Sequence, residues 1–250
     1  MSPAPKPDAS ASSPPDGGAS SIPSDAGTDS GVPLFHDDFE GSQPLPRAWD
    51  LMTTTGGALD LDPSLFVSPT TSLRATSIGL DAGAPGDAVN VTLRKLFTLP
   101  PAGTTMAYAF EAYPRQYDAT ANAVIGALQI SDGAGDLYEL QLDVQKNAAG
   151  ALSVIFAEYT GFADGGTAYV PHPIPGSLAV GTWTSIRIEL VLVQPPLARV
   201  FFDGSLQLET SVTPTIAGTA VQISLGLSYA SAPTEAWVVN YDDATYSLAP

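Results

Sequence analysis

The chain has 250 residues, a formal net charge of −17 and no cysteine. The absence of cysteine excludes disulfides, thiolate metal sites and cysteine nucleophiles, and two histidines are too few for a zinc site built from imidazoles. The acidity argues against nucleic acid and anionic membranes as partners, because both require a basic surface. It suits solubility, divalent cations or neutral ligands.

Residues 1–32 differ in composition from the rest of the chain. They consist mainly of Pro, Ser, Ala, Gly and Asp and contain no aromatic residue, which predicts a disordered linker because too little apolar surface can be buried. Residues 33–250 then form one domain of ordinary size. A Pro/Ser/Ala-rich tail suits a spacer that holds a module away from a surface. We therefore expect a secreted or bacterial surface protein, with a lipoprotein that has lost its acylated cysteine as one hypothesis.

The first half of the predicted domain reads as a series of strands. Residues 88–98 alternate Val89, Val91 and Leu93 with polar side chains, and 105–113, 123–131, 137–145 and 152–160 also have strand patterns. Residues 161–180 contain several prolines and read as a loop.

Residues 181–209 predict an antiparallel meander. In 184–193 apolar and polar residues alternate, the prolines at 195 and 196 end the strand, and Asp203-Gly204 supplies the pair with positive φ that a tight hairpin needs. Strands at 220–230 and 235–248 follow. No window has helical periodicity, so the sequence predicts an all-β, two-sheet antiparallel sandwich of roughly 12–14 strands, and we expect a monomer.

Four segments resemble the concanavalin A-like lectin/glucanase superfamily, which includes laminin G-like and laminarinase-like domains. They are FHDDFEG followed by Trp49, TSLRATS, the meander TWTSIRIEL…ARVFFDG, and the closing WVVNYDDATY. The resemblance implies a jelly roll in which the last strand lies beside the first and a concave sheet commonly binds carbohydrate.

The polar row Glu139, Gln141 and Asp143 is the main candidate for chemistry. Alternate side chains of a strand point the same way, about 6.6 Å apart, so these three would line one groove. Similar glucanases carry E-x-D-x-E at this place, whereas this chain has E-L-Q-L-D. The lost central acid and the shortened last one count against retaining hydrolysis, which needs two closely placed carboxyl groups.

We consequently expect non-catalytic binding of a polysaccharide or glycan, and lean against an enzyme. The alternative is a glycan-cleaving hydrolase or lyase that uses Glu139 and Asp143. A second alternative is a protein-binding adhesion module, and an ordinary solvated strand face remains the simplest interpretation of the row.

Further groove residues are predicted around the row. Tyr113 and Tyr117 could stack on sugars, and Arg115, Arg187 and Glu189 could bind polar groups. Packing is the competing role for the tyrosines, and a cross-strand ion pair at the surface is the competing role for Arg187 and Glu189.

The acidic ends suggest a metal site. Asp38 and Asp242 would converge if the first and last strands are neighbours, and carboxylate oxygens are ligands that Ca²⁺ prefers. A structural Ca²⁺ is the one cofactor predicted, and independent surface acids are the alternative.

Overall fold

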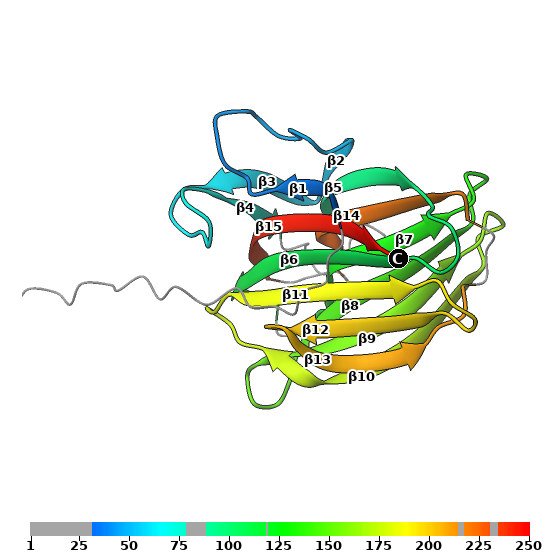
Figure 1. Cartoon of the computed structure of the whole chain (residues 1–250). Helices are drawn as coiled ribbons and strands as arrows, with labels where there is room; N and C mark the ends of the chain where they lie inside the picture. Colours follow the sequence, from blue (N-terminus) through cyan, green and yellow to red (C-terminus); the bar gives the residue numbers. More distant parts are fainter. Residues whose placement is uncertain (1–31, 79–88, 119, 215–217, 231–234) are drawn as a thin grey trace, which may run out of the picture.

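The computed structural model describes residues 32–78, 89–118, 120–214, 218–230 and 235–250 (Figure 1). All regular secondary structure in these segments is β-strand, and it forms fifteen strands in two sheets. The all-β antiparallel sandwich is therefore confirmed. The linker predicted for 1–32 falls outside the described residues except for Val32.

The first sheet has eight strands. Its order is β13 (Ser205–Ser211), β12 (Leu197–Phe202), β11 (Thr184–Val191), β6 (Thr105–Gln116), β15 (Val238–Ala249), β4 (Ser72–Ser77) and β3 (Gly57–Asp62), with β1 (Val32–Asp37) also paired to β15.

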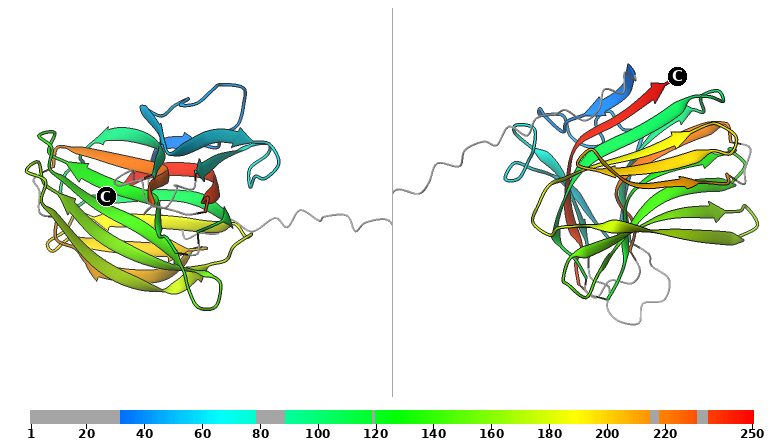
Figure 2. Two further views of the ribbon diagram at one scale, coloured as in Figure 1. Left: turned by 180° about the vertical axis from the view of Figure 1, so that it is seen from behind. Right: turned by 60° about the horizontal axis from the view of Figure 1, so that its bottom comes forward.

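The second sheet has seven strands. Its order is β10 (Thr167–Leu178), β9 (Leu152–Gly161), β8 (Leu137–Lys146), β7 (Ala123–Ser131), β14 (Ala220–Ala230), β5 (Val89–Thr98) and β2 (Leu51–Thr55). Strands β6, β11 and β12 lie nearest the viewer in Figure 1, whereas β7, β8 and β9 come forward when the molecule is turned in Figure 2 (left).

Alternation of apolar and polar residues explains the two layers. On β6, Met106, Tyr108 and Phe110 are almost completely buried, and on β8 Tyr138 and Leu140 are as well. These side chains meet between the sheets in one core. The polar residues between them must then project from the outer faces of the sandwich.

The ends of the chain and the meander follow the sequence prediction. One half of β15 pairs with β4 and the other half with β1, so the last strand does lie beside the first. Strands β11, β12 and β13 form the predicted meander. Asp203 and Gly204 have φ of 48° and 73° at its hairpin.

The loop predicted for 161–180 is wrong. Most of it is strand β10, which pairs only with β9 at the edge of the seven-stranded sheet. Its prolines, Pro171, Pro173 and Pro175, occupy alternate positions. An edge strand tolerates such prolines, because every second backbone position faces no partner strand.

In the described segments, no helix is long and apolar enough to cross a membrane.

Candidate active site

A groove of about 630 Å³ lies on the outer face of the seven-stranded sheet. This volume is in the range of ordinary ligand sites. Its lining comes from six strands, β5, β14, β7, β8, β9 and β10, and from Asn122 just before β7. The remaining lining residues are Arg94, Val124, Gln129, Glu139, Gln141, Asp143, Tyr159, Tyr169, Gln222, Ser224, Ser228 and Tyr229.

Strand register brings side chains that are far apart in the sequence into rows across this face. Gln222, Gln129, Glu139, Tyr159 and Tyr169 are successive neighbours on β14, β7, β8, β9 and β10. Within this row the Gln222 amide nitrogen donates to the Gln129 oxygen over 3.0 Å. The floor of the groove is thus polar and crosses the strands.

Asp143 forms the best-defined contacts in the groove. It is 4% exposed, and the Gln141 Nε2 donates to its Oδ1 over 2.9 Å while the Tyr169 Oη donates to its Oδ2 over 2.6 Å. Burial raises the pKa of Asp143, and the two hydrogen bonds act against that rise. Burial and the neighbouring Asp143 raise the pKa of Tyr169. The phenol therefore keeps its proton and points it at a carboxylate.

Glu139 has a different environment on the same strand. Burial raises its pKa to about 7, and the positive charge of Arg94 acts against this rise while Asp143 adds to it. Among the described residues that line the groove, Arg94 is the one cation. Its buried Nε has no hydrogen-bond partner within the described part of the chain. A carboxyl group that titrates near neutral pH suits proton transfer.

The predicted row Glu139, Gln141 and Asp143 is thus brought together in the groove. Tyr113, Arg115, Arg187 and Glu189 are not, because they lie on β6 and β11 of the other sheet. The alternation of apolar and polar residues correctly predicts that these side chains point away from the core. They lie on the outer face of the eight-stranded sheet, however, and the groove lies on the outer face of the seven-stranded sheet.

Each of these residues has a local partner instead. Arg115 pairs with Asp62 at 2.9 Å, and Tyr113 packs against Trp183 with ring centroids 5.3 Å apart. The Arg187 Nε lies 3.3 Å from an oxygen of Glu189 on the same strand. Glu189 is 3% exposed, so this ion pair differs from the surface pair between strands that was considered as their alternative role.

Tyr117 follows β6 and does not line the groove. Its hydroxyl donates to the Gly150 carbonyl over 3.4 Å, and its ring lies 6.2 Å from that of Trp237.

Several groove residues were missed by the sequence prediction, chiefly Arg94, Tyr159, Tyr169 and Tyr229. Arg94 occupies a polar position of an alternating strand, so its orientation was readable. Tyr169 was hidden in the segment read as a loop. The order of strands within a sheet, which places β5, β14 and β10 beside β8, has no local signal.

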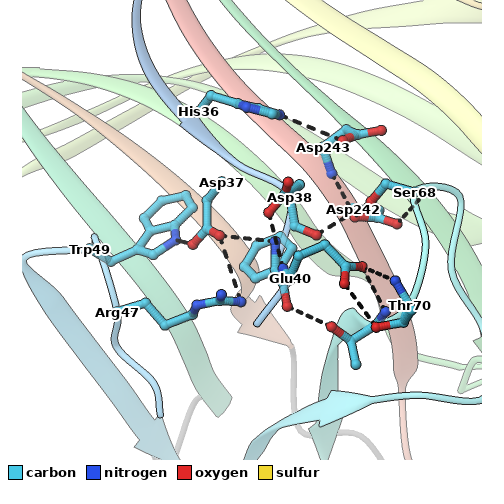
Figure 3. Close-up of polar contacts among 12 residues, drawn as sticks. His36, Asp37, Asp38, Glu40, Arg47, Trp49, Ser68, Thr70, Asp242 and Asp243 are labelled. Atoms are coloured by element: carbon cyan, nitrogen blue, oxygen red, sulfur yellow. Dashed lines mark hydrogen bonds and ion pairs between the residues drawn. The ribbon is translucent and has the colours of Figure 1, made fainter. Parts of the chain in front are cut away.

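The acidic residues at the chain ends do converge (Figure 3). Asp242 is completely buried, and its carboxylate accepts hydrogen bonds from the Val67 and Ser68 backbone and from the Ser68 hydroxyl at 2.8–3.0 Å. Asp38 accepts one from the Glu40 backbone at 3.0 Å. Among the described residues, no three His, Asp or Glu side chains are arranged to hold a metal ion. The Ca²⁺ site stays a prediction, to be tested by melting the protein in EDTA and in Ca²⁺.

No family model and no curated protein sequence matches this chain. Solved structures do match this chain. The chain is similar to an endo-β-1,4-glucuronan lyase from the fungus Trichoderma reesei, with a TM-score of 0.65 and 16% identity over 86% of this chain and 95% of that one. It is also similar to the PL-14 alginate lyase from Aplysia kurodai, with a TM-score of 0.52 and 10% identity over 75% and 86%. A variant of alginate lyase A1-II′ matches with a TM-score of 0.50 and 11% identity over 75% and 83%.

The chain thus shares a jelly-roll sandwich fold with these three lyases. This finding corrects the expectation of a non-catalytic binding module and the leaning against an enzyme, because these three neighbours cleave polysaccharides. The departures in the row at 139–143 are departures from a hydrolase motif. Elimination has no need of two carboxyl groups at the hydrolase spacing.

Proposed function

We propose that this protein is a polysaccharide lyase, which cleaves a uronate-containing chain by β-elimination in the groove of the seven-stranded sheet. One observation carries the proposal. The groove brings together a cation, a protonatable carboxyl group and a tyrosine hydrogen-bonded to a second carboxylate, namely Arg94, Glu139 and the Tyr169–Asp143 pair. The lyases with this fold support it.

The cation addresses the first requirement of the reaction. The carboxylate of a uronate sugar acidifies the hydrogen on its neighbouring carbon, C5, and it gains negative charge when that hydrogen leaves. Arg94 can hold this carboxylate and stabilise the developing charge, because a guanidinium donates in a planar, bidentate manner. The amides of Gln129 and Gln222 lie on the same floor and can add neutral donors.

The Tyr169–Asp143 pair supplies the base. Tyr169 is 47% exposed, whereas Asp143 is buried behind it. As the Tyr169 oxygen takes the proton from C5, its own proton passes along the 2.6 Å hydrogen bond to Asp143. A buried carboxylate that orients and activates an exposed hydroxyl is a general arrangement for such a step.

Glu139 supplies the acid. With a pKa of about 7, it is about half protonated at pH 7 and mostly protonated in mildly acidic solution. It gives its proton to O4 as the C4–O4 bond breaks and the C4–C5 double bond forms. Two carboxyl groups on one strand then have separate duties because their surroundings differ. Solvent afterwards takes the proton from Asp143 and returns one to Glu139, and no water is consumed.

The product assay tests this function. The protein is incubated with glucuronan and with alginate, and with a neutral β-glucan as control. We expect ultraviolet absorbance from the new double bond, in step with new reducing ends, on one of the uronate polymers only. Reducing ends without that absorbance would indicate a hydrolase, and no cleavage of either polymer would contradict an enzyme of this specificity.

Other properties stay proposals beside it. The four sequence segments support membership of the concanavalin A-like superfamily, and the composition of 1–32 supports secretion or display on a bacterial surface. A monomeric state and a structural Ca²⁺ rest on the sequence argument alone.

A further inference from the structure

Strand β14 contains an irregularity beside the groove. Its register shifts against β7 between Leu225 and Tyr229, and against β5 between Leu227 and Ala230. Gly226 lies at this place with φ of 118°. A Cβ there would lie 2.2 Å from the Val91 carbonyl oxygen. Only glycine fits this position, so the β-bulge is built into the sequence.

The bulge changes which side chains reach the groove. Leu227 and Ala230 are both completely buried in the core. In a regular strand, one outward-facing residue separates two consecutive core residues. Between Leu227 and Ala230, two residues face outward. Ser228 and Tyr229 are consecutive, and both line the groove. β-bulges near active sites often re-aim a side chain in this manner.

Both side chains have contacts to offer a ligand. The Tyr229 side chain is among the exposed large hydrophobic groups, with 44% exposure. The Ser228 Oγ is buried and has no hydrogen-bond partner in the described part of the chain. An exposed aromatic ring next to an unused hydroxyl is suited to a sugar, whose faces are apolar and whose rim is polar.

Tyr229 lies close to the proposed reacting groups. Tyr229 pairs with Val124 on β7, and Val124 pairs with Asp143 on β8. Tyr229 is therefore two strands from Asp143, about 9–10 Å away at the backbone. Tyr159 and Tyr169 lie on the opposite side, on β9 and β10. Glu139 and Asp143, both on β8, thus have tyrosines on both sides.

We propose that Ser228 and Tyr229 form a sugar-binding subsite, which holds the polysaccharide on the β14 side of the bond to be cleaved. The chain then lies across the strands, from Tyr229 over β7 and β8 toward Tyr159. The inference rests on the proposed function for the location of the cleaved bond. The binding of a sugar by Tyr229 does not depend on it.

The test compares Tyr229→Ala and Tyr229→Phe with the unchanged protein on glucuronan and alginate oligosaccharides of defined length. For Tyr229→Ala we expect KM to rise about tenfold on long oligosaccharides with kcat within about threefold, and the preferred cleavage position to move. Tyr229→Phe keeps the ring and should resemble the unchanged protein. Phe66→Ala removes another exposed ring, 40% exposed, outside the groove, and serves as the control.

Calorimetric titration with the same oligosaccharides separates the two proposals. If the unchanged protein binds them but cleaves none, and Tyr229→Ala loses that binding, the subsite stands and the lyase proposal fails. If Tyr229→Ala melts like the unchanged protein and retains its KM, affinity and cleavage pattern, the subsite is overturned. Should Tyr229→Ala fail to fold, Ser228→Ala must weaken binding for the subsite to stand.

Discussion

Glu139 and Asp143 lie on one strand and share one face, yet their surroundings differ. Asp143 accepts hydrogen bonds from Gln141 and Tyr169. For Glu139, burial outweighs the attraction of Arg94, and its pKa rises to about 7. Their different surroundings therefore give Glu139 the role of acid and Asp143 a role in the base of the proposed reaction.

This difference predicts the pH dependence of stability. The folded-state pKa of Glu139 lies above its unfolded value, so its contribution to stability is present below about pH 4.5 and is lost as the pH rises through about 7. The rise in pKa from 4.5 to about 7 corresponds to about 3 kcal/mol, so Glu139→Gln should melt roughly 6–12 °C higher than the unchanged protein at pH 8 and show little difference near pH 4. Thermal denaturation at both pH values checks this. An equal shift at both would show that the charge of Glu139 has no part in it.

The same residue predicts an alkaline limit to activity. As general acid, Glu139 must be protonated, so kcat/KM should fall as the pH rises above about 7. Glu139→Gln should lose most of the rate at every pH. A rate that instead increases through pH 7 would assign Glu139 the role of base.

Tyr169→Phe tests the proposed base at the level of one atom. The change removes the hydroxyl that donates to Asp143, and we expect kcat to fall by about 10²–10⁴-fold. Tyr113→Phe, on the other sheet, is the matched control and should retain full activity. Initial rates of double-bond formation give the comparison, and cleavage by Tyr169→Phe within threefold of normal would remove Tyr169 from the mechanism.

Among the elements, β9 contributes a second buried carboxylate, which faces the interior rather than the groove. Glu158 is 8% exposed. It accepts hydrogen bonds from the Tyr138 hydroxyl over 2.6 Å and from the Thr213 backbone over 3.0 Å, and the His172 Nε2 lies 2.9 Å away. Because Thr213 follows β13 of the other sheet, this carboxylate ties the two sheets together near their edge.

Replacing Glu158 by glutamine should therefore destabilise the sandwich. We expect a loss of about 1.5–3 kcal/mol at neutral pH, because hydrogen bonds to a charged group are lost. The pKa of Glu158 is lowered by these partners, although burial opposes them. Its stabilisation is thus present at neutral pH and disappears as the pH falls through its folded-state pKa.

Denaturant titrations at neutral and acidic pH measure this effect. Glu209→Gln is the control, since Glu209 forms an ion pair with Arg199 at 2.7 Å but is 47% exposed, and such pairs contribute about 0–1 kcal/mol. A Glu158→Gln protein as stable as this control would show that the contact between sheets is unimportant.

The elements also show what the sequence could predict. Alternation in 137–145 and 184–193 was enough to place Glu139 and Asp143 on an outer face and to define the meander. It could not tell that β8 and β11 belong to different sheets, so Arg187 and Glu189 were assigned to the wrong face. The orientation of Tyr229 toward the groove depends on a β-bulge. The segment of β10 was predicted as a loop because it contains prolines, which an edge strand tolerates. The placement of β8, β10 and β11 is set by strand order, which arises from contacts between distant segments.

At the scale of the whole molecule, the net charge of −17 opposes the approach of a polyanion. Added salt screens this repulsion, since the Debye length falls from about 30 Å at 0.01 M to about 8 Å at 0.15 M. We expect kcat/KM on a polyuronate to increase roughly two- to fivefold between these ionic strengths. A steady decrease would mean that the attraction of Arg94 outweighs the repulsion of the whole surface.

Cleavage by elimination in the groove differs from hydrolysis in the mass of the products formed in water enriched in heavy oxygen. Glucuronan or alginate is digested, and the new ends are analysed by mass spectrometry. For elimination we expect fragments whose new non-reducing ends are lighter by one water than those of hydrolysis products. These fragments should carry no heavy oxygen from cleavage, after exchange at the reducing end is corrected with a preformed oligosaccharide. Full-mass fragments that take up one heavy oxygen for each bond cleaved would contradict elimination.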